Sequence, residues 1–263
     1  GGGGGGGNHA SLQSEVSGLL WNPKDTPELT DVATEDHKLP DKIKFVHGRT
    51  TSWLRGSGGG VSYNADGNAV FTVGPLGVIF SKRTHTQKFY RGHTDYPVGA
   101  FAPAPGTNFV ATADLGRASV EDGTPNSHGE LHIWNTCTGE SLCVLPAYHR
   151  APVLATALAR DEGGGGSLTC VTVGGESMHT LAVWDIDVVN PGRPPHLIHT
   201  AEPGLNCILF CAFMKPRRLG FFTGGVGHIH FWRFDGRNLH STKGRSRDDL
   251  DTPLGVDLAQ TVF

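Results

Sequence analysis

From residue 43 onward, apolar and polar residues alternate over short runs that are separated by turns rich in Gly, Pro, Asn and Asp. A period of two places successive side chains on opposite faces of a strand, so these runs predict β-strands. Sixteen runs fall into four groups of four: 60–63, 69–73, 77–81 and 87–90; 98–102, 109–113, 130–135 and 141–145; 153–159, 168–173, 181–186 and 196–200; 207–213, 219–223, 228–234 and 238–241. A last run, 254–263, has the pattern of a first strand without the rest of its group.

Each group carries an aromatic residue near the end of its third run. Trp134, Trp184 and Trp232 close the runs LHIWN, LAVWD and IHFWR, with spacings of 50 and 48 residues, and Phe80 takes the same place in the first group. Four-stranded units repeated at about 40–50 residues with such an aromatic are typical of β-propeller blades. The sequence therefore predicts an all-β WD-repeat propeller of about four blades plus one further strand, incomplete or open, with a closed four-bladed ring as the alternative.

The Gly-His pair in the stretch RGHTD lies 41 residues before Trp134, where a WD repeat carries its Gly-His pair. WD repeats join a His, an Asp and the Trp by hydrogen bonds within one blade, and the candidates here are His93, Asp114 and Trp134. We expect this network to be structural, because a buried imidazole and a buried indole N–H both need hydrogen-bond partners. Trp184 and Trp232 are assigned to the same structural role in blades that keep less of the pattern.

The residues before the first strand differ in composition. Residues 1–7 are all Gly, which is typical of a flexible tail or linker, and the stretch SLQSEVSGLLW could form a helix of at most three turns or remain a coil. We expect a flexible N-terminus at 1–38, a hydrophobic motif at 39–60, and propeller blades over 61–263 that are incomplete at the C-terminus. Open strand edges are prone to aggregation, so we expect the C-terminal edge to be covered by further sequence or by a partner.

Composition narrows the range of partners. The net charge of −3 gives no general attraction to nucleic acid or to an anionic membrane, and neither is an expected partner. The longest apolar run, 207–214, is shorter than the ~20 residues that span a bilayer. Five Cys without a CxxC pair favour a reducing compartment, in which the thiols act as small core residues.

No catalytic, metal or cofactor site is predicted. His228 and His230 with Cys207 and Cys211 suggest zinc, but strand alternation explains the two His equally well and no compact set of four ligands is evident. The Gly-rich stretches at 56–60 and 224–227 lack the Lys-Ser/Thr pair of a phosphate-binding loop. There is no GxSxG, HExxH or acid-base carboxylate pair, so we expect a protein that is not an enzyme. A catalytic site in a central channel is the weaker alternative.

Basic residues are placed at turns that would emerge on one face of a propeller, since the turns between strands one and two and between strands three and four share a face. The set comprises Lys82, Arg83 and Lys88 in the first blade and Lys215, Arg217, Arg218 and Arg237 in the fourth. Such a face could bind an acidic protein surface, with charge governing orientation and association rate. Ordinary solvated turns are the alternative.

The order of these features resembles the echinoderm microtubule-associated-protein-like family. LPDKIKFVHG at 39–48 resembles the hydrophobic HELP motif before that family's first propeller, and TQKFYRGHTD at 86–95 resembles its first blade junction. ESMHTLAVWD at 176–185 and HIHFWRFDGRNL at 228–239 resemble later blades in the same order. Two departures are the RTTS that follows residue 48, where the family has an aromatic and a second Gly, and the lack of a trimerising coiled coil.

The resemblance implies a non-enzymatic propeller without a cofactor. Its partners would be tubulin, microtubules or microtubule-associated proteins, in the cytoplasm, on the cytoskeleton or in the axoneme of a cilium. A generic WD-repeat scaffold for another protein complex is the alternative.

Overall fold

The computed structural model describes residues 42–49, 60–93, 96–116, 129–161, 166–204, 206–215, 220–225, 228–235 and 238–244. The chain divides into two units, and all of these residues lie in the second, Lys38–Phe263. Within the described part the regular structure consists of sixteen β-strands without a helix. The predicted run at 254–263 and the first 41 residues lie outside the described residues.

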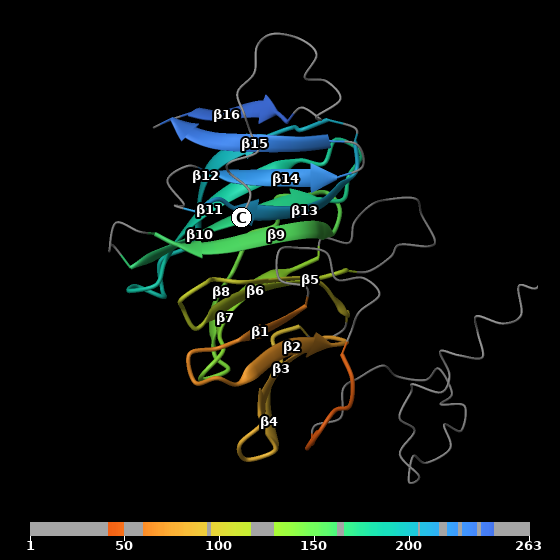
Figure 1. The fold of residues 1–263 in the computed structure, drawn as a ribbon, viewed down its shortest axis with the longest axis vertical. Helices are drawn as coiled ribbons and strands as arrows, with labels where there is room; N and C mark the ends of the chain where they lie inside the picture. The colour runs from red at the N-terminus through yellow and green to blue at the C-terminus, as the bar shows by residue number, and fades with distance from the viewer. Residues whose placement is uncertain are drawn as a thin grey trace, which may run out of the picture. The chain divides into compact units, whose positions relative to one another are not determined.

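The strands form four antiparallel sheets, and in each sheet consecutive strands are neighbours (Figure 1). The first contains β1 (Val61–Tyr63), β2 (Ala69–Val73), β3 (Leu76–Ser81) and β4 (Thr86–Tyr90). The second contains β5 (Val98–Pro103), β6 (Phe109–Asp114), β7 (Leu131–Asn135) and β8 (Ser141–Val144). The third contains β9 (Val153–Arg160), β10 (Ser167–Gly174), β11 (Leu181–Asp187) and β12 (His196–Ala201). The fourth contains β13 (Ile208–Phe213), β14 (Phe221–Gly225), β15 (His228–Asp235) and β16 (Asn238–Lys243).

This arrangement confirms the predicted fold class. Four consecutive four-stranded sheets, none of them closed into a barrel, form an open or incomplete WD-type propeller, and the sheets are its blades. The observed strands begin and end within about two residues of the predicted runs. Glycines at positive φ, such as Gly67 (73°) and Gly106 (72°), lie in the tight turns between the first and second strands of blades one and two.

The core lies between successive blades, in three apolar clusters. Val70, Ile79 and Tyr90 of blade one form one cluster with Trp134 of blade two, and the Tyr90 ring stacks on Trp134. The other clusters join blades two and three around Trp184, and blades three and four around Trp232. Each of these Trp side chains is 0–4% exposed. Burying ~150–250 Å² of indole contributes about 4 kcal/mol or more, so the three Trp residues of the repeat hold adjacent blades together.

The segment 42–49 packs on the face of blade one that carries Phe80. In the sheet register, Phe80 of β3 lies opposite Ala69 of β2 and Gln87 of β4. The Phe45 ring lies edge-on to the Phe80 ring, with the ring centroids 6.1 Å apart. The Val46 N–H donates to Gln87 Oε1 at 2.8 Å, and Gln87 Nε2 donates to the Val46 carbonyl at 3.0 Å. The segment thus occupies the face that in the other blades contacts the preceding blade.

Candidate functional site

The predicted blade-two residues come together around a shared threonine. His93 Nδ1 lies 3.0 Å from Asp114 Oδ2, and His93 Nε2 lies 2.8 Å from Thr112 Oγ1. Trp134 Nε1 donates to the same Thr112 oxygen at 3.0 Å. These distances fit one arrangement: the His93 Nδ1–H donates to the carboxylate, and the Thr112 hydroxyl donates to Nε2 while accepting from the indole. All three predicted residues lie in one network, but Thr112, which joins them, was not among the predicted residues.

Asp114 has a second contact that closes the base of a loop. Its Oδ1 accepts hydrogen bonds from the Gly116 N–H at 2.9 Å and the Glu130 N–H at 3.2 Å. These two residues flank 117–128, which lies outside the described residues. The Asp114 carboxylate therefore holds the His93 imidazole and also the backbone of Gly116 and Glu130.

Blade three has a matching network that the sequence analysis underestimated. His149 Nε2 lies 2.7 Å from Thr172 Oγ1, and Trp184 Nε1 donates to the same oxygen at 3.2 Å. His149 Nδ1 faces Thr180 Oγ1 at 2.8 Å and Glu176 Oε1 at 3.5 Å. Burial raises the pKa of Glu176, but hydrogen bonds from His149 and the backbone outweigh it and leave that pKa below its usual value.

His149 could have been found from its position 35 residues before Trp184, although no Gly precedes it. In blade four, Trp232 Nε1 donates to Thr223 Oγ1 at 2.9 Å, and no imidazole is hydrogen-bonded to this threonine in the described part of the chain. Blade three therefore has the His–Thr–Trp hydrogen bonds without the Gly-His pair, and the described part of blade four has only the Thr–Trp bond.

The junction of blades one and two contains a second series of hydrogen-bonded side chains. The Tyr90 ring stacks on Trp134 with centroids 4.6 Å apart, and the Tyr90 hydroxyl lies 2.7 Å from His132 Nδ1. His132 Nε2 in turn lies 3.0 Å from Glu130 Oε2. Burial raises the pKa of Tyr90, and burial together with the neighbouring His93 lowers the pKa of His132. These groups link two blades, and each has a partner within the junction.

Two glycines make this junction possible. A Cβ at Gly77 would lie 2.5 Å from Cζ2 of Trp134, and a Cβ at Gly92 would overlap the Tyr90 hydroxyl. The glycine of the RGHTD stretch therefore leaves room for the hydrogen bond from Tyr90 to His132.

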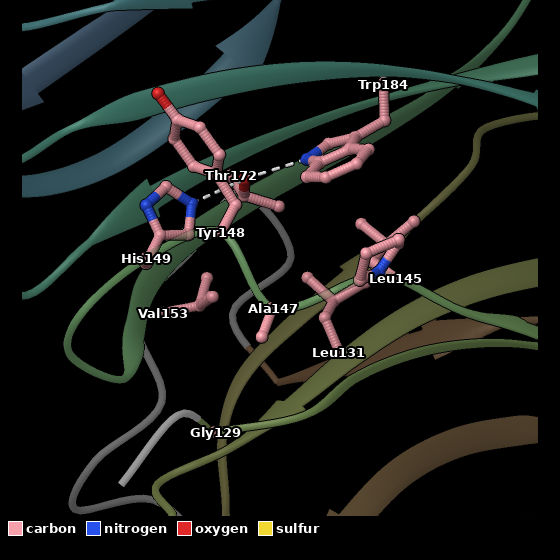
Figure 2. Close-up of a pocket in the computed structure, with 10 residues that line it drawn as sticks. Gly129, Leu131, Leu145, Ala147, Tyr148, His149, Val153, Thr172 and Trp184 are labelled. Carbon is pink, nitrogen blue, oxygen red and sulfur yellow. Dashed lines mark hydrogen bonds between the residues drawn. The ribbon is translucent and has the colours of Figure 1, made fainter. Parts of the chain in front are cut away.

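A shallow hollow lies between blades two and three (Figure 2). Its lining is mainly apolar and comprises Gly129, Leu131, Leu145, Pro146, Ala147, Tyr148, His149, Val153, Thr172 and Trp184. Figure 2 shows the bonds of His149 and Trp184 to Thr172 at one side of the hollow. Because His149 already has partners on both nitrogens, the hollow is better suited to receive an apolar side chain than to transfer protons.

The residues considered for zinc lie on the fourth blade. The rings of His228 and His230 are 5.5 Å apart, while burial strongly raises the pKa of Cys211 and so disfavours the thiolate that a metal would need. Among the described residues, no group of three or more His, Cys, Asp or Glu is placed to hold a metal ion. All five cysteines lie in the described part, and none forms a disulfide.

The predicted basic face is only partly described. Lys82, Arg83 and Lys88 are exposed on the β3–β4 turn and on β4, and Lys215 is exposed after β13. Arg217, Arg218 and Arg237 lie outside the described residues. The binding role of this set stays a prediction.

Comparison with known proteins gives one consistent result. No family model matches the chain. The chain is 25% identical to the 77 kDa echinoderm microtubule-associated protein of Strongylocentrotus purpuratus over 179 residues, which cover 68% of this chain and 24% of that protein. It is 26% identical over 181 residues to echinoderm microtubule-associated protein-like 1 of Rattus norvegicus, covering 68% and 20%. It is 25% identical over 228 residues to echinoderm microtubule-associated protein-like 4 of Mus musculus, covering 86% and 21%.

The chain resembles the echinoderm microtubule-associated-protein-like family. The similarity is distant, and the chain spans about a quarter of the length of these curated relatives or less. The relatives are named as microtubule-associated proteins and not as enzymes. In the described residues, no helix has the length and apolar character needed to cross a membrane.

Proposed function

We propose that this chain is part of a non-enzymatic, microtubule-associated WD-repeat protein that binds the tubulin lattice or proteins on it. The observation that carries the proposal is the similarity to a relative named as microtubule-associated over 228 residues, or 86% of the chain. The four-blade architecture supports it, because propellers present large surfaces to other proteins. The proposed locations are the cytoplasm and the cytoskeleton, including the axoneme of a cilium.

The proposed domain organisation follows the sequence: a flexible N-terminus at 1–38, the HELP-like motif at 39–60 and the blades at 61–263. Segment 42–49, which lies against blade one, supports a motif that is continuous with the propeller. The proposed lattice-binding face comprises Lys82, Arg83, Lys88, Lys215, Arg217, Arg218 and Arg237. Exposure of the four described members supports this role.

Co-sedimentation with taxol-stabilised microtubules at physiological salt tests the proposal. The 263-residue chain is expected in the pellet, and the bound fraction should fall as salt is raised because charge contributes to binding. A protein that stays in the supernatant would contradict direct binding. Pull-down from cell extract then decides between binding through lattice proteins, which recovers tubulin, and a generic scaffold, which recovers an unrelated assembly.

We also propose that the free face of blade four is covered in the native assembly, by further sequence or by a partner. The residue three positions before the blade Trp is 3% exposed in blade two (Leu131) and 0% in blade three (Leu181), where the next blade covers it. Its counterpart in blade four, Ile229, is 44% exposed, and Phe210 nearby is 37% exposed. An apolar face at the same position in each blade supports the same kind of contact in each.

The scaffold alternative also has one observation in its favour. The hollow between blades two and three is lined by Tyr148, which is 38% exposed, and by apolar side chains. Such a hollow could hold a side chain of a partner that is not a microtubule protein. A Tyr148→Ala variant that loses a pulled-down partner without losing tubulin would support this second function.

A further inference from the structure

Positive charge is concentrated at one end of the described chain. Residues 42–93 contain eight Lys and Arg and a single Asp, in a chain whose net charge is −3. Seven of these eight cations are among the described residues, on the segment 42–49, on blade one or just after β4, whereas the described residues 96–244 hold nine Asp and Glu and six Lys and Arg.

Three contacts bring segment 42–49 to the basic turn of blade one. The Phe45 ring stacks on His85, with centroids 5.5 Å apart and planes at 22°, and Val46 is held at both its N–H and its carbonyl by Gln87. His85 lies in the β3–β4 turn with φ of 53°, a conformation that residues with a Cβ rarely adopt. Blade two has Gly139, with φ of 79°, at the corresponding place in its turn. His85 thus places its imidazole against Phe45 at a position where glycine would be less strained.

Five exposed cations surround these contacts. We call them the basic strip: Lys42, Lys44, Lys82, Arg83 and Lys88. Each lies within three residues of Phe45, His85 or Gln87, which is about 10 Å along extended backbone. None of the five forms an ion pair with another described residue. Figure 1 shows the segment beside β3 and β4.

We propose that the basic strip is the docking site for an extended, acidic polypeptide segment of the partner. This inference rests on the proposed function and specifies which part of the chain meets the acidic partner. Exposed cations on two adjoining chain segments can follow an extended acidic peptide, and their exposure preserves attraction at low salt. A long nucleic acid or an anionic vesicle would also meet blades two to four, whose described residues hold nine Asp and Glu against six Lys and Arg and so offer it no net attraction.

The primary test measures binding of a fluorescent decaglutamate peptide to the 263-residue chain at low salt. The variant Lys44→Glu/Lys82→Glu/Arg83→Glu should weaken binding about tenfold or more. A matched control, Arg150→Glu/Arg160→Glu/Lys243→Glu, makes the same charge change at exposed residues outside the strip and should weaken binding by less than about threefold. Equal losses in the two variants would overturn the proposal, because they would show an effect of net charge alone.

A second variant tests whether the position of segment 42–49 matters when the number of cations is unchanged. Phe45→Ser removes no cation but removes the ring that contacts His85 and Phe80. Decaglutamate binding should weaken severalfold when the segment is released, and unchanged affinity would overturn the role of segment 42–49. Single-stranded RNA or an anionic vesicle that binds more tightly than decaglutamate, and is lost in the strip variant, would overturn the assignment to an acidic polypeptide.

Microtubule co-sedimentation distinguishes this inference from the proposed function. If the wild-type chain binds decaglutamate through the strip but neither pellets with microtubules nor recovers tubulin by pull-down, the proposed function fails and the strip remains a binding site for acidic peptides. If wild type and strip variant pellet equally and bind decaglutamate equally, the strip is overturned and the proposed function remains.

Discussion

At the scale of single residues, two buried threonines differ in whether their hydroxyls have partners. Thr112 accepts from Trp134 and bonds to His93, whereas Thr72 is 0% exposed and its hydroxyl is without a partner among the described residues. Thr112→Val should therefore lower the free energy of unfolding by about 2–4 kcal/mol, since two buried polar groups lose their partner. Thr72→Val should leave it unchanged or raise it by about 1 kcal/mol.

Urea unfolding of both variants against wild type measures this difference. Both substitutions replace a hydroxyl by a methyl group at a buried strand position, so each is the control for the other. Similar losses in both would contradict the shared role of Thr112 at the centre of its network.

His132 gives a residue-scale prediction for pH. Burial and the neighbouring His93 hold the pKa of His132 below the ordinary histidine value of 6.5 in the folded protein. Below that value the unfolded chain binds more protons than the folded one, so the free energy of unfolding should fall as pH drops below about 6.5. His132→Gln should reduce this dependence, and the exposed His196→Gln should not. Urea unfolding at about pH 7.5 and about pH 5.5 checks it, and equal pH dependence in wild type and His132→Gln would contradict it.

The network shows what sequence can identify at this scale. His93, Asp114 and Trp134 stand at characteristic positions around a Gly-His pair, so their association could be predicted. Thr112 could not be singled out, because a threonine in a strand fits either face and its partner depends on the register between β6 and β7. His149 was missed because its blade keeps the hydrogen bonds without the flanking glycine.

At the scale of elements, strands were predictable because each alternating run is bounded by Gly, Pro or Asn turns. The position of segment 42–49 was not, since it has no strand pairing in the described structure and depends on the side chain of Gln87. Side-chain contacts of this kind, including those of Phe45, have no signature in local periodicity.

At this scale we predict how the hydrogen bonds between Gln87 and Val46 affect amide exchange in segment 42–49. Gln87→Ala removes both hydrogen bonds to Val46, and amide hydrogen exchange in a peptide covering 42–49 should accelerate about tenfold. Exchange in blades two to four should stay as in wild type, since the change lies on the outer face of blade one. The neighbouring Thr86→Ala serves as control because Thr86 is exposed. Unchanged exchange in the Gln87 variant would show that Phe45 alone holds the segment.

At the scale of the whole molecule, the same interface repeats between each pair of successive blades. It explains why the blades pack in chain order and why the outer face of blade four is exposed. Each blade Trp contacts the preceding blade, so the face of blade four that carries Ile229 would receive the aromatic residue of a following sheet. The repeat spacing predicted this succession, but the extent of the exposed apolar face required the side-chain positions. An uncovered apolar sheet face favours association between copies in solution.

Two substitutions at the same blade position test this view of blade four. Ile229→Lys places a charge at a residue that is 44% exposed, and it should increase the monomer fraction in sedimentation velocity without lowering the melting temperature by more than a few degrees. Leu181→Lys makes the corresponding change in blade three, where the residue is 0% exposed, and should prevent folding, because an unpaired charge would be buried between blades. If Ile229→Lys is as damaging as Leu181→Lys, then the face of blade four is already covered within the 263-residue chain. Its proposed covering by further sequence or a partner would then be wrong.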